Sequence, residues 1–168
     1  MNENIDLNKL PSDVKKEFMK YALKLKEKKT KSKVHDDFLT FAKHVWPEFI
    51  EGKHHKIIAE KFNRLAKGEI KRLIINMPPR HTKSEFASNL LPAWMIGRKP
   101  NLKIIQTTHT TELAVRFGRK AKTLIDSPEY QQVFQTRLRE DSQAAGKWET
   151  EQGGEYYAAG VGSAITGR

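Results

Sequence analysis

The sequence predicts an α/β fold with a parallel sheet, flanking helices and an N-terminal helical segment. Apolar, strand-like runs at 71–76 and 103–108 are each followed by a segment with helical spacing. The order strand, loop, helix, strand, helix is typical of a parallel sheet with crossover helices, in which ligands bind at the carboxyl ends of the strands. The chain has 168 residues and a hydrophobic content of 38%, enough for one core. We therefore expect one domain with appendages.

The composition favours a polyanionic partner. The net charge is +11, which suggests nucleic acid first and an anionic membrane surface as the alternative. No segment approaches the ~20 apolar residues of a membrane span, and MNENIDLNKL lacks the apolar stretch of a signal peptide. We expect a soluble intracellular protein. With no cysteine, disulfides, Cys-type zinc sites and thiol chemistry are excluded.

Residues 1–34 are expected to form a basic helix and a linker. Apolar residues recur at helical spacing at Val14, Phe18, Tyr21, Ala22 and Leu25, and lysines recur on another face at Lys16, Lys20, Lys24 and Lys28. This lysine face predicts either direct DNA contact or a solvated face on a docking helix. The charged run Lys26–Lys33 is interpreted as a linker.

Helices and strands alternate along the rest of the chain. Two amphipathic helices are predicted, one around Phe38–Trp46 that Pro47 stops and one over 54–67 that Gly68 closes.

After them we expect, in order, a strand at 71–76, a loop, a helix from Lys83 to Ile96 that Pro92 kinks or shortens, a strand over Lys103–Thr108, and a helix striped by Leu113, Phe117, Ala121 and Leu124. Short strands or a β-hairpin are expected within Lys147–Arg168.

The loop before Lys83 carries the pattern of a phosphate-binding loop. In such loops backbone N–H groups surround a phosphate, a lysine reaches the β- and γ-phosphates, and a Ser or Thr hydroxyl holds Mg²⁺. Aligned to G-x-x-x-x-G-K-[ST], Lys83 and Ser84 fit, but Met77 and Thr82 replace the two glycines. Thr82 must therefore adopt the loop backbone with a Cβ attached. The alternative is an ordinary proline turn with a surface Lys-Ser pair.

Three stretches carry a resemblance to a known family. GEIKRLIINMPPRHTKSEFAS, KIIQTTHTTELAVRFGRKAK and EYYAAGVGSAITGR resemble the ATPase domain of the large terminase subunit, the DNA-packaging motor of tailed bacteriophages, over about residues 35–168. Family members commonly carry an N-M-P-P-R-H-x-K-S loop, usually with glycine at the position of Thr82. The resemblance implies an ASCE-type P-loop NTPase domain.

The resemblance also implies roles for single residues. Lys83 binds phosphate, Ser84 holds Mg²⁺, and Arg80 is the loop arginine, with pairing to a surface carboxylate as its alternative. The remaining ATP-binding positions are Pro79, His81, Thr82 and Glu85. His54-His55 match a polar motif that contacts the nucleotide base, with His55 as the candidate; a capped helix start is the alternative.

Two further positions follow from the same resemblance. Thr107–Thr110 resembles a helicase-like motif that couples the nucleotide pocket to DNA, or else it caps the next helix. Arg168, in the loop Gly162–Arg168, matches a catalytic arginine finger; its alternative is a residue with no fixed role.

Hydrolysis requires a strand aspartate that holds Mg²⁺, and no apolar run followed by Asp-Glu occurs here. Thr123–Asp126 is rejected, because it ends a helical stripe. We therefore expect an incomplete ATPase domain at 35–168, without the Walker B strand and nuclease domain, that alone binds ATP weakly and hydrolyses it poorly or not at all.

The implied function is ATP-driven translocation of double-stranded DNA into a procapsid in the host cytoplasm. The implied partners are the portal protein, the small terminase subunit and further copies in a homo-oligomeric ring. Two alternatives stay open: a helicase-like P-loop ATPase fragment, and a non-catalytic basic nucleic-acid-binding module.

Overall fold

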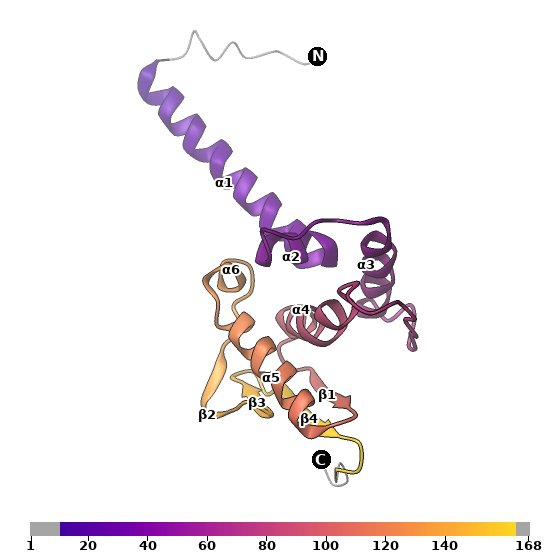
Figure 1. Ribbon diagram of the computed structural model, residues 1–168. Helices are drawn as coiled ribbons and strands as arrows, with labels where there is room; N and C mark the ends of the chain where they lie inside the picture. Colours follow the sequence, from indigo (N-terminus) through magenta and orange to yellow (C-terminus); the bar gives the residue numbers. More distant parts are fainter. Residues whose placement is uncertain (1–10, 164–168) are drawn as a thin grey trace.

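A four-stranded mixed sheet with helices packed on one face forms the body of the protein. The structure is a computed structural model and describes residues 11–163 (Figure 1). The strands are β1 (Lys103–Thr108), β2 (Leu138–Ala144), β3 (Lys147–Thr150) and β4 (Glu155–Gly160), and their order in the sheet is β1-β4-β3-β2. The α/β class is therefore confirmed.

The sheet is only partly parallel, as the predicted parallel sheet and the predicted C-terminal hairpin together require. β1 and β4 are parallel, whereas β2 with β3 and β3 with β4 are antiparallel. Short turns join the last three strands, and strands joined so closely can pair only as antiparallel neighbours. The hairpin expected after Lys147 is confirmed as β3 and β4.

The N-terminal helix α1 (Ser12–Asp36) is continuous through the expected linker. The linker prediction for Lys26–Lys33 is wrong, because Lys and Glu are good helix formers and the run contains neither Gly nor Pro. Only the C-terminal end of α1 lies against the body (Figure 1), where Val34 is buried. There the Trp94 indole donates hydrogen bonds to the Val34 and His35 carbonyls at 3.3 and 3.1 Å.

Helices α2 (Phe38–Val45) and α3 (Lys53–Ala66) confirm the two predicted amphipathic helices. Asp37 caps α2 by accepting the Thr40 N–H at 2.7 Å. The Asn63 side chain bonds both the Asp37 carboxylate and the Phe38 N–H, which ties α3 to the start of α2. The ring of Phe38 then packs, at centroid distances of 4.9–5.5 Å, against Phe62, Phe86 and Trp94.

The helix that follows the loop starts at Lys83 and passes through Pro92 without a break. Its first part is π-helical, η2 (Glu85–Leu90), and it continues as α4 (Leu91–Arg98). The helix is therefore not shortened at Pro92, and a kink there stays a prediction. The wider π turns change the hydrogen-bond ladder just before the ring, and the Leu91 N–H bonds the Phe86 carbonyl five residues back.

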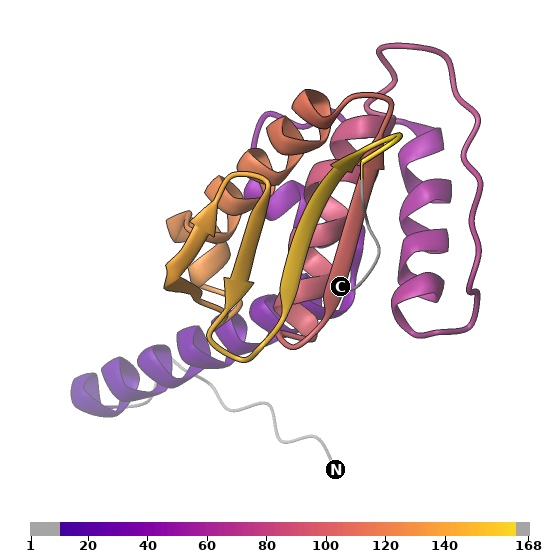
Figure 2. The ribbon, with the colours of Figure 1, turned by 90° about the horizontal axis from the view of Figure 1, so that it is seen from below.

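The strand expected at 71–76 is absent from the described structure. The segment is extended, and its side chains alternate: Leu73, Ile75 and Met77 pack against the core, whereas Ile74 is 86% exposed. It forms no ladder with β1–β4, and a strand exists only where a neighbour supplies its hydrogen bonds. Figure 2 shows this segment on the far side of α3 from β1.

Two helices, α5 (Thr111–Ile125) and α6 (Pro128–Gln131), complete the described fold. α5 confirms the predicted helix and packs on β1 and β4, but its fully buried side is made of Ala114, Gly118, Ala121 and Ile125, so only Ala121 of the predicted stripe is fully buried. Its Gly118 allows this approach, since a Cβ there would lie 2.9 Å from the Tyr156 ring and still closer to the Ala145 carbonyl. Among residues 11–163 no helix combines the length and the apolar character that crossing a bilayer requires.

Candidate functional site

The loop that connects the extended segment to Lys83 lies at the end of the sheet where β1 and β4 finish. Figure 2 shows this loop at the same end of the molecule as the arrowheads of β1 and β4 and as the start of α5. One hydrogen bond between side chains, from Gln106 of β1 to Ser88 of η2 at 3.4 Å, links the strand to the helix that the loop begins. The loop thus lies at the edge of the sheet where a ligand was predicted to bind, although the strand expected directly before the loop is not formed.

Two residues of the loop have left-handed backbone conformations. Arg80 has φ of 63° and Thr82 has φ of 59°, and they are the non-glycine residues with positive φ in the described chain. Residues that carry a Cβ rarely have backbone angles in this region, whereas glycine adopts them readily. Thr82 therefore has the backbone shape expected of the glycine that it replaces, despite its branched side chain.

A histidine from α3 holds Thr82 in this conformation. The Gly52 N–H donates to His55 Nδ1 at 2.8 Å, so Nδ1 carries no proton and the neutral ring carries its hydrogen on Nε2. That Nε2–H donates to Thr82 Oγ1 at 2.6 Å, and the Thr82 hydroxyl donates in turn to the His81 carbonyl at 2.7 Å. We call this chain from Gly52 to His81 the histidine latch.

The surroundings of His55 favour its neutral form. His55 is 5% exposed, and its ring packs against the rings of Phe49 and Phe86, at centroid distances of 4.7 and 5.0 Å. Burial is the main cause that lowers the pKa of His55; the nearby His54 and His81 lower it further, and Glu51 opposes them. A neutral ring is the form that the histidine latch requires.

The predicted phosphate and metal ligands begin the helix after the loop. Lys83 reaches back across the loop, where its ammonium donates to the Pro78 carbonyl at 3.4 Å. Ser84 is exposed in the first turn. Glu85 points elsewhere, because its carboxylate accepts from the Asn89 amide and pairs with Lys120 of α5 at 2.8 Å.

The remaining loop residues are Pro79, Arg80 and His81, and all three are exposed. His81 Nδ1 donates to the Pro79 carbonyl at 2.9 Å, which closes the turn around Arg80.

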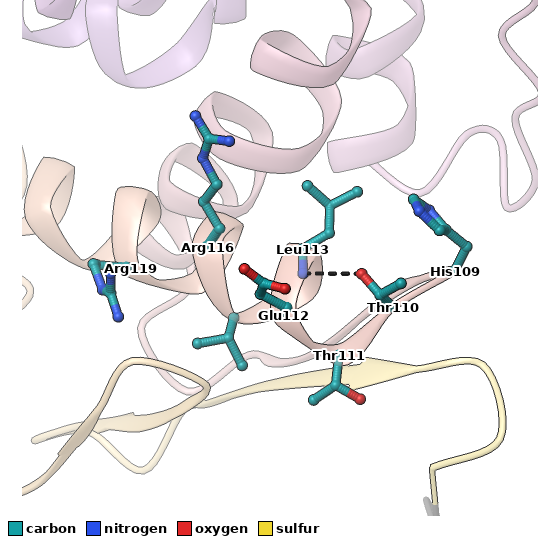
Figure 3. A pocket seen from close by; sticks show the side chains of 8 residues that line it. His109, Thr110, Thr111, Glu112, Leu113, Arg116 and Arg119 are labelled. Carbon is teal, nitrogen blue, oxygen red and sulfur yellow. Dashed lines mark hydrogen bonds between the residues drawn. The ribbon is translucent and has the colours of Figure 1, made fainter.

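The turn between β1 and α5 forms the second part of this end of the molecule. Thr110 caps α5 by accepting the Leu113 N–H at 3.3 Å, and Thr108 donates to the Thr110 carbonyl at 2.6 Å. The capping role predicted for this motif is confirmed. A cleft of about 590 Å³ follows the start of α5, with His109 at one end and Arg119 at the other (Figure 3).

Some sequence-predicted residues are not brought together with the loop. Arg168 lies outside the described residues, as do residues 1–10 of the expected N-terminal unit. The ring of His55, the candidate for base contact, contacts the loop itself, so contact with a base stays a prediction. Asp126 ends α5, which agrees with its rejection as a metal ligand, and burial raises its pKa.

Sequence reasoning missed the histidine latch and the ion pair between Glu85 and Lys120. The residues that form each link are 27 and 35 positions apart, and only the fold brings them together. The available signal was the departure from glycine at Thr82, which requires a compensating contact somewhere in the chain. Within 11–163 no group of three or more His, Asp or Glu residues is placed to hold a metal ion.

No family model matches this chain, and searches of the curated proteins and of the solved structures find no match either.

Proposed function

We propose that residues 35–163 form the nucleotide-binding part of an ATP-driven motor that moves double-stranded DNA, of the kind found in large terminase subunits. One observation supports this proposal above the others: Thr82, which stands at the motif glycine before Lys83, has the left-handed backbone conformation that glycine favours, and Arg80 in the same loop has it too. Such backbone conformations cost of order 1–3 kcal/mol each and persist where the surroundings enforce them, often at ligand sites.

The residues present fit a magnesium nucleotide. Backbone N–H groups of the loop would surround a phosphate at the start of the helix, where the helix dipole favours an anion. Lys83 would exchange the Pro78 carbonyl for the β- and γ-phosphates, and Arg80 would add a forked contact to phosphate oxygens. The Ser84 hydroxyl would bind Mg²⁺, which neutralises charge on the phosphates during transfer.

Isothermal titration of the chain with MgATP tests the proposal. We expect binding that Lys83→Ala weakens at least tenfold, because a charged hydrogen bond to phosphate is worth about 1.5–3 kcal/mol. Lys71→Ala is the matched control, since Lys71 is an exposed lysine in the segment before the loop, and it should leave the affinity unchanged. Unaltered ATP affinity in Lys83→Ala would refute the assignment of the loop.

A basic nucleic-acid-binding module without catalysis is the second candidate, and α1 favours it. This helix carries nine lysines against four Asp or Glu residues. Affinity for a DNA duplex that is equal with and without ATP, together with no ATP binding at millimolar concentration, would favour this module over the motor. In both cases DNA affinity should fall steeply with added salt, because phosphate contacts release counterions.

A further inference from the structure

Helix α1 presents an apolar stripe that faces away from the rest of the protein. Val14, Phe18, Tyr21 and Leu25 are spaced by four, three and four residues, which is the spacing of the core positions of a coiled coil. We call these four residues the seam. At about 100° per residue, the seam lies on the opposite side of the helix from Val34, which is the residue of α1 that is buried against the body.

The seam is exposed over its whole length. The exposed fractions are 41% for Val14, 44% for Phe18, 62% for Tyr21 and 42% for Leu25. Four neighbouring apolar side chains on a projecting helix form a continuous strip, and such strips mark interaction sites more often than scattered surface residues do. Figure 1 shows the seam-bearing half of α1 well clear of the other helices.

The charges around the seam determine which partner fits. The flanking positions of this coiled-coil register, which select partners by charge, hold four lysines and one acidic residue, Glu17; the lysines are Lys15, Lys24, Lys29 and Lys31. The lysine excess of α1 makes pairing with a second copy unfavourable, because like charges at these positions repel. Nucleic acid would match the lysines but would leave the aromatic and aliphatic seam in water.

We propose that α1 is a docking helix for an acidic amphipathic helix of another protein, whose apolar face packs along the seam. This partner satisfies both properties of α1, since it covers the apolar strip and brings carboxylates to the lysines. The inference does not depend on the nucleotide-binding function, because the seam and the loop share no residue.

The test uses two synthetic peptides of about three heptads, with Leu at the core positions and either Glu or Lys at all flanking positions. Each peptide carries a fluorophore, and its anisotropy is followed as the full chain is added. We expect the acidic peptide to bind at least about tenfold more tightly than the basic one, and Lys24→Glu with Lys31→Glu to abolish this preference, because the flanking charges are then nearly balanced.

Variants of the seam separate this partner from the other possible occupants. Phe18→Ala with Leu25→Ala should weaken acidic-peptide binding about tenfold or more and leave the helix content by circular dichroism unchanged, because Ala is the best helix former. Met19→Ala is the matched control, since Met19 is exposed on the same turn but lies outside the seam, and it should bind as the parent does.

Three results would overturn the proposal. If the seam variant bound the acidic peptide as tightly as the parent does, the interaction would depend on charge alone and not on the seam. Tighter binding of a DNA duplex or of anionic lipid vesicles, lost in the seam variant, would assign the seam to those partners. Dimerisation of the parent chain that the seam variant abolishes, observed by sedimentation, would make a second copy the occupant.

Discussion

At the scale of single residues, His55 is bonded to a threonine, Thr82, whose backbone has a conformation that glycine adopts more readily. A threonine keeps a positive φ only when something holds it there, and the 2.6 Å bond from the buried imidazole supplies that restraint. A positive φ at position 82 can therefore be stabilised in two ways: by glycine without a partner, or by threonine bonded to a histidine.

This reasoning predicts rescue in a double variant. His55→Ala should weaken MgATP binding, because Thr82 can then leave the left-handed region. Adding Thr82→Gly should restore the affinity to within about twofold of the parent, since glycine adopts positive φ without a partner. Calorimetry on both variants measures the effect, and Thr82→Gly alone should bind at least as well as the parent. Failure of the rescue, with Lys83→Ala still defective, would mean that His55 acts otherwise than through Thr82.

The lowered pKa of His55 predicts a pH dependence of stability. The unfolded chain binds this proton with the ordinary histidine pKa of about 6.5, whereas the folded chain binds it only at lower pH. Stability from the neutral ring is therefore complete above about pH 6.5 and falls as the pH drops below that value. His54, His81 and Glu51 are the nearby ionisable groups that act on the pKa of His55, the two histidines lowering it and Glu51 raising it.

Urea unfolding between pH 5 and 8 checks this dependence. His55→Gln, which keeps hydrogen-bonding groups but cannot ionise in this range, should show a shallower decline toward acid than the parent. An identical slope in the two proteins would show that His55 does not titrate differently in the folded and unfolded chains.

At the scale of helices and strands, the packing of α5 on the sheet depends on Gly118. A methyl group there would meet the Ala145 carbonyl and the Tyr156 ring, and the carbonyl is backbone that cannot turn aside. The Gly118 carbonyl also accepts the Trp148 indole N–H at 3.2 Å, so any displacement of α5 strains that bond as well.

Gly118→Ala should lower the free energy of unfolding by about 1–3 kcal/mol, even though alanine favours a helix over glycine. The control Thr123→Ala changes an exposed residue of the same helix and should alter stability by about 0.5 kcal/mol or less. Urea denaturation measures both. A Gly118→Ala protein as stable as the parent would show that α5 can move away from the sheet at little cost.

The elements differ in how far the sequence predicts them. The apolar spacing of α2, α3 and α5 is local information, and these helices were expected close to their observed positions. The segment at 71–76 has an equally clear strand pattern, but pairing depends on a neighbour that local sequence does not specify. At the site, the motif identified Lys83 and Ser84, whereas the histidine latch depends on the approach of α3 to the loop.

At the scale of the whole molecule, the sheet is covered on one face only. Helix α5 packs behind β1 and β4, and no described helix covers the opposite face, where Ile105 is 54% exposed (Figure 2). β1 is also the edge strand, and its outer backbone groups have no ladder partner in the described chain. An edge of this kind is a template for association between chains.

Ile105→Lys should therefore reduce self-association of the chain at high concentration without lowering its thermal midpoint, because a charge at an exposed edge position opposes pairing. Ile57→Lys is the control: it places the same charge on α3, where Ile57 is 61% exposed, and it should leave association unchanged. Light scattering against concentration compares the variants. An equal effect of the two lysines would attribute the change to net charge.

The π-helical stretch Glu85–Leu90 sets the angular phase between the two ends of its helix. A π turn closes its hydrogen bond over five residues instead of four, so the stretch has the effect of one residue inserted into an α-helix. Excising one residue there would rotate Lys83 and Ser84 by about 100° around the helix axis relative to the buried Trp94. The π-helical stretch therefore determines the direction in which the Lys83 ammonium and the Ser84 hydroxyl point, although it begins after both residues.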